Sequence, residues 1–284
     1  MASSPYSSAQ AARDRVSRRL RDLRADAGIS GTELAVGCGW THSKTSRLEN
    51  GRTAPTPEDI RRWCQACGAA DEAEDLIAQS RDAESAYVEW RRSTRAGLRR
   101  LQDSYVSLYQ STQAFRIYSP TLIPGLLQTE GYASGILRIS AAFQDLPVDD
   151  SAEAARARVD RSQIIHQPGH TFAFVVEEAV LRYQVCDTDA MAAQLGYLLT
   201  AGALPQVSLG IIPMAVPQRG QWPRETFHMY DDDLVSVELV SARVKVTQPS
   251  EIQMYARAFE ELRSMAVYGA EARGLVLTAI DALR

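Results

Sequence analysis

Apolar residues in the first 70 positions recur at helical spacing, in runs that each end at a glycine. In the run over residues 11–27, Val16, Leu20 and Leu23 fall on one face of a helix. Gly28 follows, and a glycine adopts without strain the left-handed backbone that ends a helix. The same pattern predicts helices over residues 30–38, 41–50 and 56–68.

The second and third of these predicted helices are joined by a tight turn. Ser30 and Glu33 match a capping box, in which the serine hydroxyl accepts from the glutamate amide while the glutamate side chain accepts from the serine amide. Gly39 ends this helix, and Thr41 is expected to cap the next one. A helix, a tight turn and a second short helix make a helix-turn-helix pattern.

The helix after the turn has a packing side and a polar side. At about 100° per residue, the packing side holds Thr41, Thr45 and Leu48. The opposite side holds short or hydrogen-bonding residues: His42, Ser43, Ser46 and Arg47. Such side chains suit the major groove of DNA, where each base pair offers its own set of donors and acceptors. We therefore predict that His42, Ser43 and Arg47 read base edges, with Arg47 able to grip guanine through two hydrogen bonds.

Groups around this helix suit the phosphate backbone. We predict backbone contacts by Arg24, Thr41, Lys44 and Arg52, with the amides at the helix start near Thr41 adding to them. The pattern alone leaves an alternative, which is a solvated amphipathic helix in an ordinary small helical bundle.

The charge distribution supports contact with an anionic polymer at the N-terminal end. Residues 1–70 carry 11 Lys and Arg against 7 Asp and Glu, a net charge of +4, whereas residues 71–284 carry 20 against 28, a net charge of −8. A basic module joined to an acidic one predicts that the first part meets nucleic acid and the second does not.

Residues 29–60 resemble the Cro/C1-type (XRE) helix-turn-helix family. The matching residues are Glu33-Leu34-Ala35, Gly39, Ser43-Lys44, Ser46 to Arg52 and Pro55. The resemblance implies an all-α, five-helix DNA-binding domain over residues 11–70. It places His42, Ser43 and Arg47 at base-reading positions and Thr41, Lys44 and Arg52 at backbone-contacting ones. The chain departs from the family pattern at Gly31, Gly37 and Cys38, where longer residues are usual.

In the remainder of the chain, the pattern of apolar and polar residues predicts a helical connector followed by an α+β domain. We expect a disordered tail over residues 1–10, a connector over 71–110 and the larger domain over 111–284. Strands are predicted over 171–176, 207–212, 227–230, 234–240 and 243–246. Helices are predicted over 151–166, over 190–200 and from about residues 250 and 270. Because helices and strands mix without regular alternation, and the turn at 231–233 predicts a hairpin, we expect a mostly antiparallel sheet.

This larger part resembles the domain of unknown function found after Cro/C1-type modules in actinobacterial, antitoxin-like regulators. The matching residues are Tyr118, Pro120, Ile123 to Thr129, Tyr132, Glu178-Ala179, Leu181-Arg182 and the strand Val207 to Pro213. The resemblance implies a small partner protein, encoded nearby, that binds this domain. It also implies a transcription regulator, for which the helix-turn-helix predicts a homodimer on a two-fold DNA operator.

Four cysteines are too few and too scattered for a disulfide framework. Cys64 and Cys67 superficially resemble a redox pair, and with Cys38 and His42 they suggest a zinc site. We favour buried, unreactive thiols, because both residues of the pair fall on the apolar side of a predicted helix.

Motifs of common enzyme classes are missing from the sequence. It holds no phosphate-binding G-x-x-x-x-G-K-[ST], no H-E-x-x-H and no G-x-S-x-G, and Glu177-Glu178 is expected to be a solvated pair at a strand end. We expect no enzyme activity, no cofactor and no metal.

Two further features of the sequence bear on membrane insertion and on small-molecule binding. The uncharged stretch 190–218 is interrupted by prolines, so we expect a cytoplasmic protein without membrane spans. A small-molecule receptor is a further alternative, with a pocket lined by Tyr197, Met214, Trp222, Phe227 and Met229.

Overall fold

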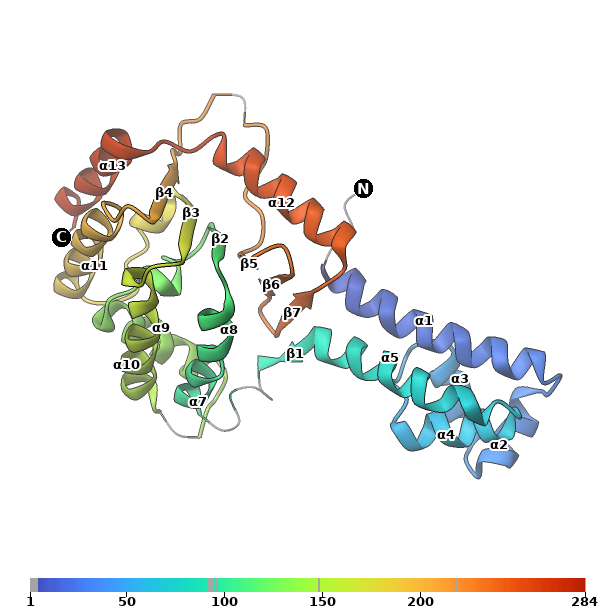
Figure 1. Ribbon diagram of the computed structural model, residues 1–284. Helices are drawn as coiled ribbons and strands as arrows, with labels where there is room; N and C mark the ends of the chain where they lie inside the picture. Colours follow the sequence, from blue (N-terminus) through green and yellow to red (C-terminus); the bar gives the residue numbers. More distant parts are fainter. Residues whose placement is uncertain (1–4, 91–93, 95–96, 148, 218, 284) are drawn as a thin grey trace. The chain divides into compact units, whose positions relative to one another are not determined.

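The computed structural model describes residues 5–90, 94, 97–147, 149–217 and 219–283. The chain divides into two compact units, residues 1–88 and 89–284, each with its own core (Figure 1). Within the described ranges, no helix is both long and apolar enough to cross a bilayer.

The first unit is all-α, as predicted. Its described residues form the helices α1 (Pro5–Asp26), α2 (Gly31–Cys38), α3 (His42–Glu49), α4 (Pro57–Ala66) and α5 (Ala73–Ala86), with a 3-10 turn at Ala70–Glu72. Leu20, Leu34 and Leu48 meet Trp63 in a fully buried core. The Trp63 indole donates a hydrogen bond of 2.9 Å to the carbonyl of Leu20, so the largest core side chain leaves no buried donor unpaired.

Both ends of the first unit differ from the sequence expectation. Helix α1 begins at Pro5, so residues 5–10 continue the helix instead of forming a tail, and residues 1–4 lie outside the described residues. Helix α5 packs on this unit, because Leu76 and Ile77 are buried in its core. The expected connector over 71–110 is therefore divided: α5 joins the first unit, while α7 (Leu98–Asp103) and α8 (Val106–Ser111) join the second.

The second unit is built on a mixed sheet, which confirms the α+β class. Its strands are β2 (Ala114–Ser119), β3 (Thr171–Glu177), β4 (Val207–Ile212), β5 (Phe227–Tyr230), β6 (Leu234–Glu238) and β7 (Ala242–Val246). They lie in the order β7-β6-β5-β2-β3-β4. The β7-β6, β6-β5 and β5-β2 pairs are antiparallel, and the β2-β3 and β3-β4 pairs are parallel. Strand β1 (Tyr87–Glu89) spans the boundary between the units.

Helices cover both faces of this sheet. They are α9 (Glu130–Phe143), α10 (Ser151–Ser162), α11 (Thr188–Ala201), α12 (Pro249–Arg263) and α13 (Gly269–Asp281), with 3-10 turns at Gly125–Leu127, Gln163–His166 and Glu178–Leu181. Phe115 and Phe172, whose rings stack with centroids 4.8 Å apart, belong to the main core with residues of α9, α11 and α13. The opposite face carries Phe227, which packs edge-on against Tyr255 of α12 at 5.1 Å.

The carboxylates Glu177 and Glu178 are both buried, so the expectation of a solvated pair is wrong. Glu177 accepts hydrogen bonds from Tyr118 at 2.9 Å and from Arg219 at 2.6 and 3.0 Å. Glu178 pairs with Arg182 at 3.2 Å and accepts from the Met214 amide. Both charges are therefore satisfied inside the fold, Glu177 by Tyr118 and Arg219 from distant parts of the chain and Glu178 by the nearby Arg182 together with the distant Met214 amide.

Candidate nucleic-acid interface

Local contacts define both ends of α2, the helix before the turn. The capping box is formed, with the Ser30 amide 2.7 Å from Glu33 Oε2 and the Glu33 amide 3.2 Å from Ser30 Oγ. Gly39 follows α2 with φ of +71°, a left-handed backbone that glycine adopts at no steric cost. The turn therefore ends α2 cleanly and leads directly into α3.

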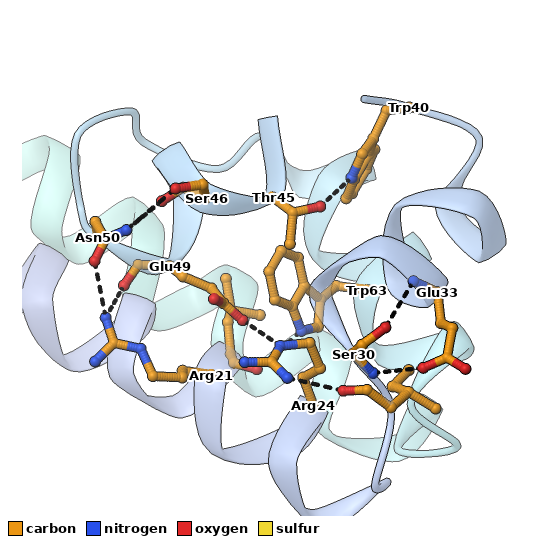
Figure 2. Close-up of polar contacts among 12 residues, drawn as sticks. Arg21, Arg24, Ser30, Glu33, Trp40, Thr45, Ser46, Glu49, Asn50 and Trp63 are labelled. Atoms are coloured by element: carbon orange, nitrogen blue, oxygen red, sulfur yellow. Dashed lines mark hydrogen bonds and ion pairs between the residues drawn. The ribbon is translucent and has the colours of Figure 1, made fainter. Parts of the chain in front are cut away.

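Two of the three residues predicted for the packing side of α3 are buried. Thr45 and Leu48 are 1% and 0% exposed. The Trp40 indole donates to Thr45 Oγ1 at 3.0 Å, which satisfies the buried hydroxyl (Figure 2). Thr41, the third residue predicted for this side, occupies the position before α3 but is exposed, and its side chain makes no capping bond to the described residues. The expectations that it packs and that it caps the helix through its hydroxyl are therefore wrong.

Two arginines of α1 hold the C-terminal end of α3. Arg24 Nε lies 2.5 Å from Glu49 Oε1, and its Nη1 donates to the carbonyl of Ile29 at 2.8 Å. Arg21 donates to the carbonyl of Glu49 at 2.5 Å and is 3.4 Å from Asn50 Oδ1 (Figure 2). These bonds satisfy groups at the helix end and join α3 to α1. Arg21 was missed from the sequence, because its partners lie 28 and 29 residues away.

The opposite side of α3 faces solvent. His42, Ser43 and Arg47 are all exposed, and none forms a side-chain hydrogen bond or ion pair with the described residues. A methyl group on Gly31 would lie 3.2 Å from Nε2 of His42. Glycine at this position, one of the departures from the family pattern, therefore leaves room for the imidazole at the start of α3.

The four predicted backbone-contacting residues divide into two kinds. Thr41 and Arg52 are exposed, and the Arg52 amide donates to the carbonyl of Arg47 at 2.9 Å, which fixes the residue directly after α3. Lys44 and Arg24 are engaged within the domain. The Lys44 ammonium lies 2.5 Å from Asp59 Oδ1 and 4.5 Å from the centre of the Trp40 ring.

The ion pair of Lys44 affects its partner as well. Burial raises the pKa of Asp59, but hydrogen bonds from Lys44 and Thr56 outweigh it and hold that pKa below its usual value. The positive charge of Lys44 is thus partly neutralised in the free domain. Among the predicted residues, Arg47 and Arg52 keep charges that no described carboxylate pairs with.

The cysteines of this unit behave as packing residues. Cys38 and Cys64 are buried, Cys67 is half-buried, and burial raises the pKa of each thiol to about 11. A reactive thiol needs the opposite shift. No group of three or more potential ligands suited to a metal ion occurs among the described residues.

Comparison with known families agrees with this division of the chain. A profile described as a helix-turn-helix domain matches residues 15–76, and one described as a domain of unknown function (DUF5753) matches residues 102–278. The chain belongs to the DUF5753 family. In this DUF5753 protein a Cro/C1-type helix-turn-helix precedes the family domain, which supports a DNA-binding regulatory protein.

No curated protein matches the chain. Among solved structures, it is similar to that of TrmBL2, an archaeal chromatin protein described as showing a novel mode of DNA binding. The identity is 10%, the match covers 85% of this chain and 88% of the other, and the TM-score is 0.33. Because that score is low, we infer nothing about the fold or the function of the DUF5753 protein from this similarity.

Proposed function

We propose that this protein is a sequence-specific transcription regulator that inserts α3 into the major groove of a DNA operator. The observation that carries the proposal is the exposed set His42, Ser43 and Arg47, presented by a helix whose other side is buried. Side chains at the start of a recognition helix contact base edges in this motif, while exposed groups beside it contact phosphates. Arg47 would read guanine, and Thr41 and Arg52 would hold the backbone.

Selection of bound duplexes from random DNA, followed by competition between the selected site and its single-base variants, tests this proposal. Replacing Arg47 with Ala removes a two-bond contact, so preference at one base pair should fall by about 1–3 kcal/mol. Arg52→Ala is the matched control, since it removes the same charge beside the helix. It should weaken binding to all sequences alike and reduce the salt dependence of binding. Equal losses on all duplexes for both variants would contradict base reading by Arg47.

We further propose that the regulator binds as a homodimer. A helix-turn-helix contacts one half-site, and a two-fold operator with half-sites about one helical turn apart engages two copies. The measurement is the stoichiometry on the selected duplex by analytical ultracentrifugation. Two chains are expected on the intact site, and one chain bound with full affinity would argue against a dimer.

A second candidate function concerns the second unit, which we propose binds a small partner protein. Ile139 and Phe143, one helical turn apart on α9, are 56% and 71% exposed. Adjacent exposed apolar side chains of this kind favour a protein contact. Co-expression with the product of a neighbouring gene tests it. Ile139→Asp should abolish co-purification, whereas Arg138→Asp, the neighbouring exposed position, should alter it less.

A further inference from the structure

The second unit contains a cavity of about 480 Å³. It lies beside α7, α8, α9 and α10, at the face of β5 and β6. Cavities that hold small molecules in proteins have volumes of this order. The five residues that the sequence suggested for a pocket, Tyr197, Met214, Trp222, Phe227 and Met229, do not line it. The lining of the cavity instead comes from residues that are distant in the sequence and that the fold brings together.

Two arginines from one face of α10 line this cavity. Arg158 donates to Gln102 Oε1 at 3.2 Å and to Gln128 Oε1 at 2.7 Å. Arg161 donates to the carbonyl of Gln102 at 2.8 Å and to its Oε1 at 3.1 Å. These partners are neutral, and no carboxylate among the described residues forms an ion pair with either guanidinium. The arrangement leaves two neighbouring cations half-buried without a direct ion-pair partner among the described residues.

Further positive charge adds to that of the two arginines. Burial, then the charge of Arg161, lowers the pKa of Arg158 to about 10. The guanidinium of Arg243, which does not itself line the cavity, lies 4.8 Å from the centre of the Tyr105 ring, and that of Arg161 lies 5.0 Å from the same ring. Glu238 is the one carboxylate among the described lining residues. Two guanidinium groups thus share the cavity lining with a single carboxylate while a third lies next to the lining ring of Tyr105, and an entering anion would offset the excess positive charge.

Polar atoms in the cavity wall also lack partners. Arg161 Nε and His228 Nδ1 are both buried, and neither has a hydrogen-bond partner among the described residues. The other nitrogen of His228, Nε2, is 4.0 Å from Glu238 Oε1. Buried polar atoms without partners are costly in a finished fold, so they mark a place where a ligand can add hydrogen bonds.

The mouth of the cavity is apolar. Phe143 and Val240 line it and are 71% and 81% exposed. Leu98, Ile123 and Leu137 contribute buried apolar surface farther in. The cavity therefore combines cationic groups with an apolar opening, which suits a ligand that has an anionic end and an apolar body.

We propose that this cavity binds a small organic anion, with its oxyanion group held by Arg158 and Arg161 and its apolar body directed toward Phe143 and Val240. Guanidinium groups bind carboxylate, sulfonate and phosphate oxygens through paired hydrogen bonds. The site goes beyond the proposed DNA contact, because all of its residues belong to the second unit. Its test requires no DNA, so it can fail or succeed independently of the regulator proposal.

The test uses the full-length chain and a fluorescent aromatic sulfonate, 8-anilino-1-naphthalenesulfonate. Its uncharged counterpart, N-phenyl-1-naphthylamine, serves as the neutral probe. We expect saturable binding of the sulfonate at one site per chain, and weaker binding of the neutral probe. Arg161→Gln should raise the dissociation constant of the sulfonate about tenfold or more, the loss that follows from removing a charge-assisted contact. The same variant should leave the neutral probe unaffected.

Arg156→Gln is the matched control, because Arg156 lies on the same helix and pairs with Glu153 at 3.0 Å outside the cavity. It should leave the affinity unchanged. Ser140→Trp fills the cavity while keeping both arginines, and should remove saturable binding. Melting curves of every variant establish that the fold is retained, and Arg161→Lys replaces Arg161→Gln if the latter unfolds. Sulfonate affinity that is equal in wild type, the Arg161 variant and Ser140→Trp would overturn the proposal. Equal affinity for both probes would overturn the claim that the cavity recognises an anionic group.

Discussion

At the scale of single residues, Arg24 is a structural contact of the first unit. Its guanidinium donates hydrogen bonds to the Glu49 carboxylate and to the Ile29 carbonyl. The side chains of Arg24 and Glu49 are only 21% and 14% exposed. Arg24→Ala should therefore lower the free energy of unfolding of this unit by about 1–2 kcal/mol, because it leaves charged and polar partners without a donor. Urea denaturation measures the change. Arg18→Ala, at an exposed position of the same helix, should cost less than about 0.5 kcal/mol, and equal losses would refute the assignment.

His228 gives the second unit a predicted dependence on pH. Burial lowers the pKa of its imidazole, with the charges of Arg161, Arg243 and Arg158 acting in the same direction and Glu238 opposing them. The unfolded chain, with a histidine pKa of about 6.5, then takes up a proton at a higher pH than the folded one. The stability that His228 contributes is therefore fully present above the unfolded-state pKa of about 6.5. It decreases as the pH falls from that value toward the lower pKa of the folded state.

Denaturation of wild type and His228→Gln between pH 7.5 and pH 5, as an approximate range around the histidine pKa, measures this contribution. The variant should lose less stability over that interval than the wild type. Parallel curves for the two proteins would show that His228 is not responsible.

The identity of the candidate reading residues could be predicted from the sequence, but the surroundings of the basic ones could not. His42, Ser43 and Arg47 follow from the angular positions on one short helix, and the structure leaves them exposed. Lys44 and Arg24 have the same charge as Arg47, yet each meets a carboxylate far along the chain, Asp59 or Glu49. Which cation is neutralised depends on tertiary contacts, and helical spacing carries no information about those.

At the scale of elements, the start of α2 and the start of α3 differ in how they are capped. Ser30 forms a reciprocal pair of hydrogen bonds with Glu33, whereas the Thr41 side chain makes none with the described residues. Ser30→Ala should destabilise the first unit by about 1 kcal/mol, and Thr41→Ala by clearly less. Thermal melting of the two variants provides the comparison. Thr41→Ala should instead weaken DNA binding. If Thr41→Ala destabilised the unit as much as Ser30→Ala does, the Thr41 side chain would have to cap α3, contrary to the structure.

Elements set by local signals were predicted well, and elements set by tertiary packing were not. Each of the four helices predicted over residues 11–68 ends at or before a glycine, the last three of them begin at a Ser or Thr, and the strand at 207–212 has its predicted bounds. Strand β2 was missed, although it lies between β5 and β3 in the sheet. It is six residues long and alternates only partly, so its strand character comes from neighbours on both sides.

At the scale of the whole molecule, the assignment of α5 to the first unit predicts where the chain can be divided. Leu76 and Ile77 are 3% and 1% exposed, so removing them opens the core of that unit. A fragment of residues 1–88 should unfold cooperatively, as judged by circular dichroism during heating. A fragment of residues 1–70, which follows the boundary expected from the sequence, should melt broadly or at a lower temperature. Identical melting of the two fragments would show that α5 does not stabilise the first unit and belongs to a connector.

The fixing of α3 from its rear side has a consequence for how such regulators diversify. Thr45, Leu48 and the bonds from Arg21 and Arg24 hold the helix without using residues 42, 43 or 47. Exchanges at those three positions should therefore leave folding almost untouched while altering which genes the protein controls. Gene duplication followed by few substitutions would be enough to create a sister protein with a different set of target promoters.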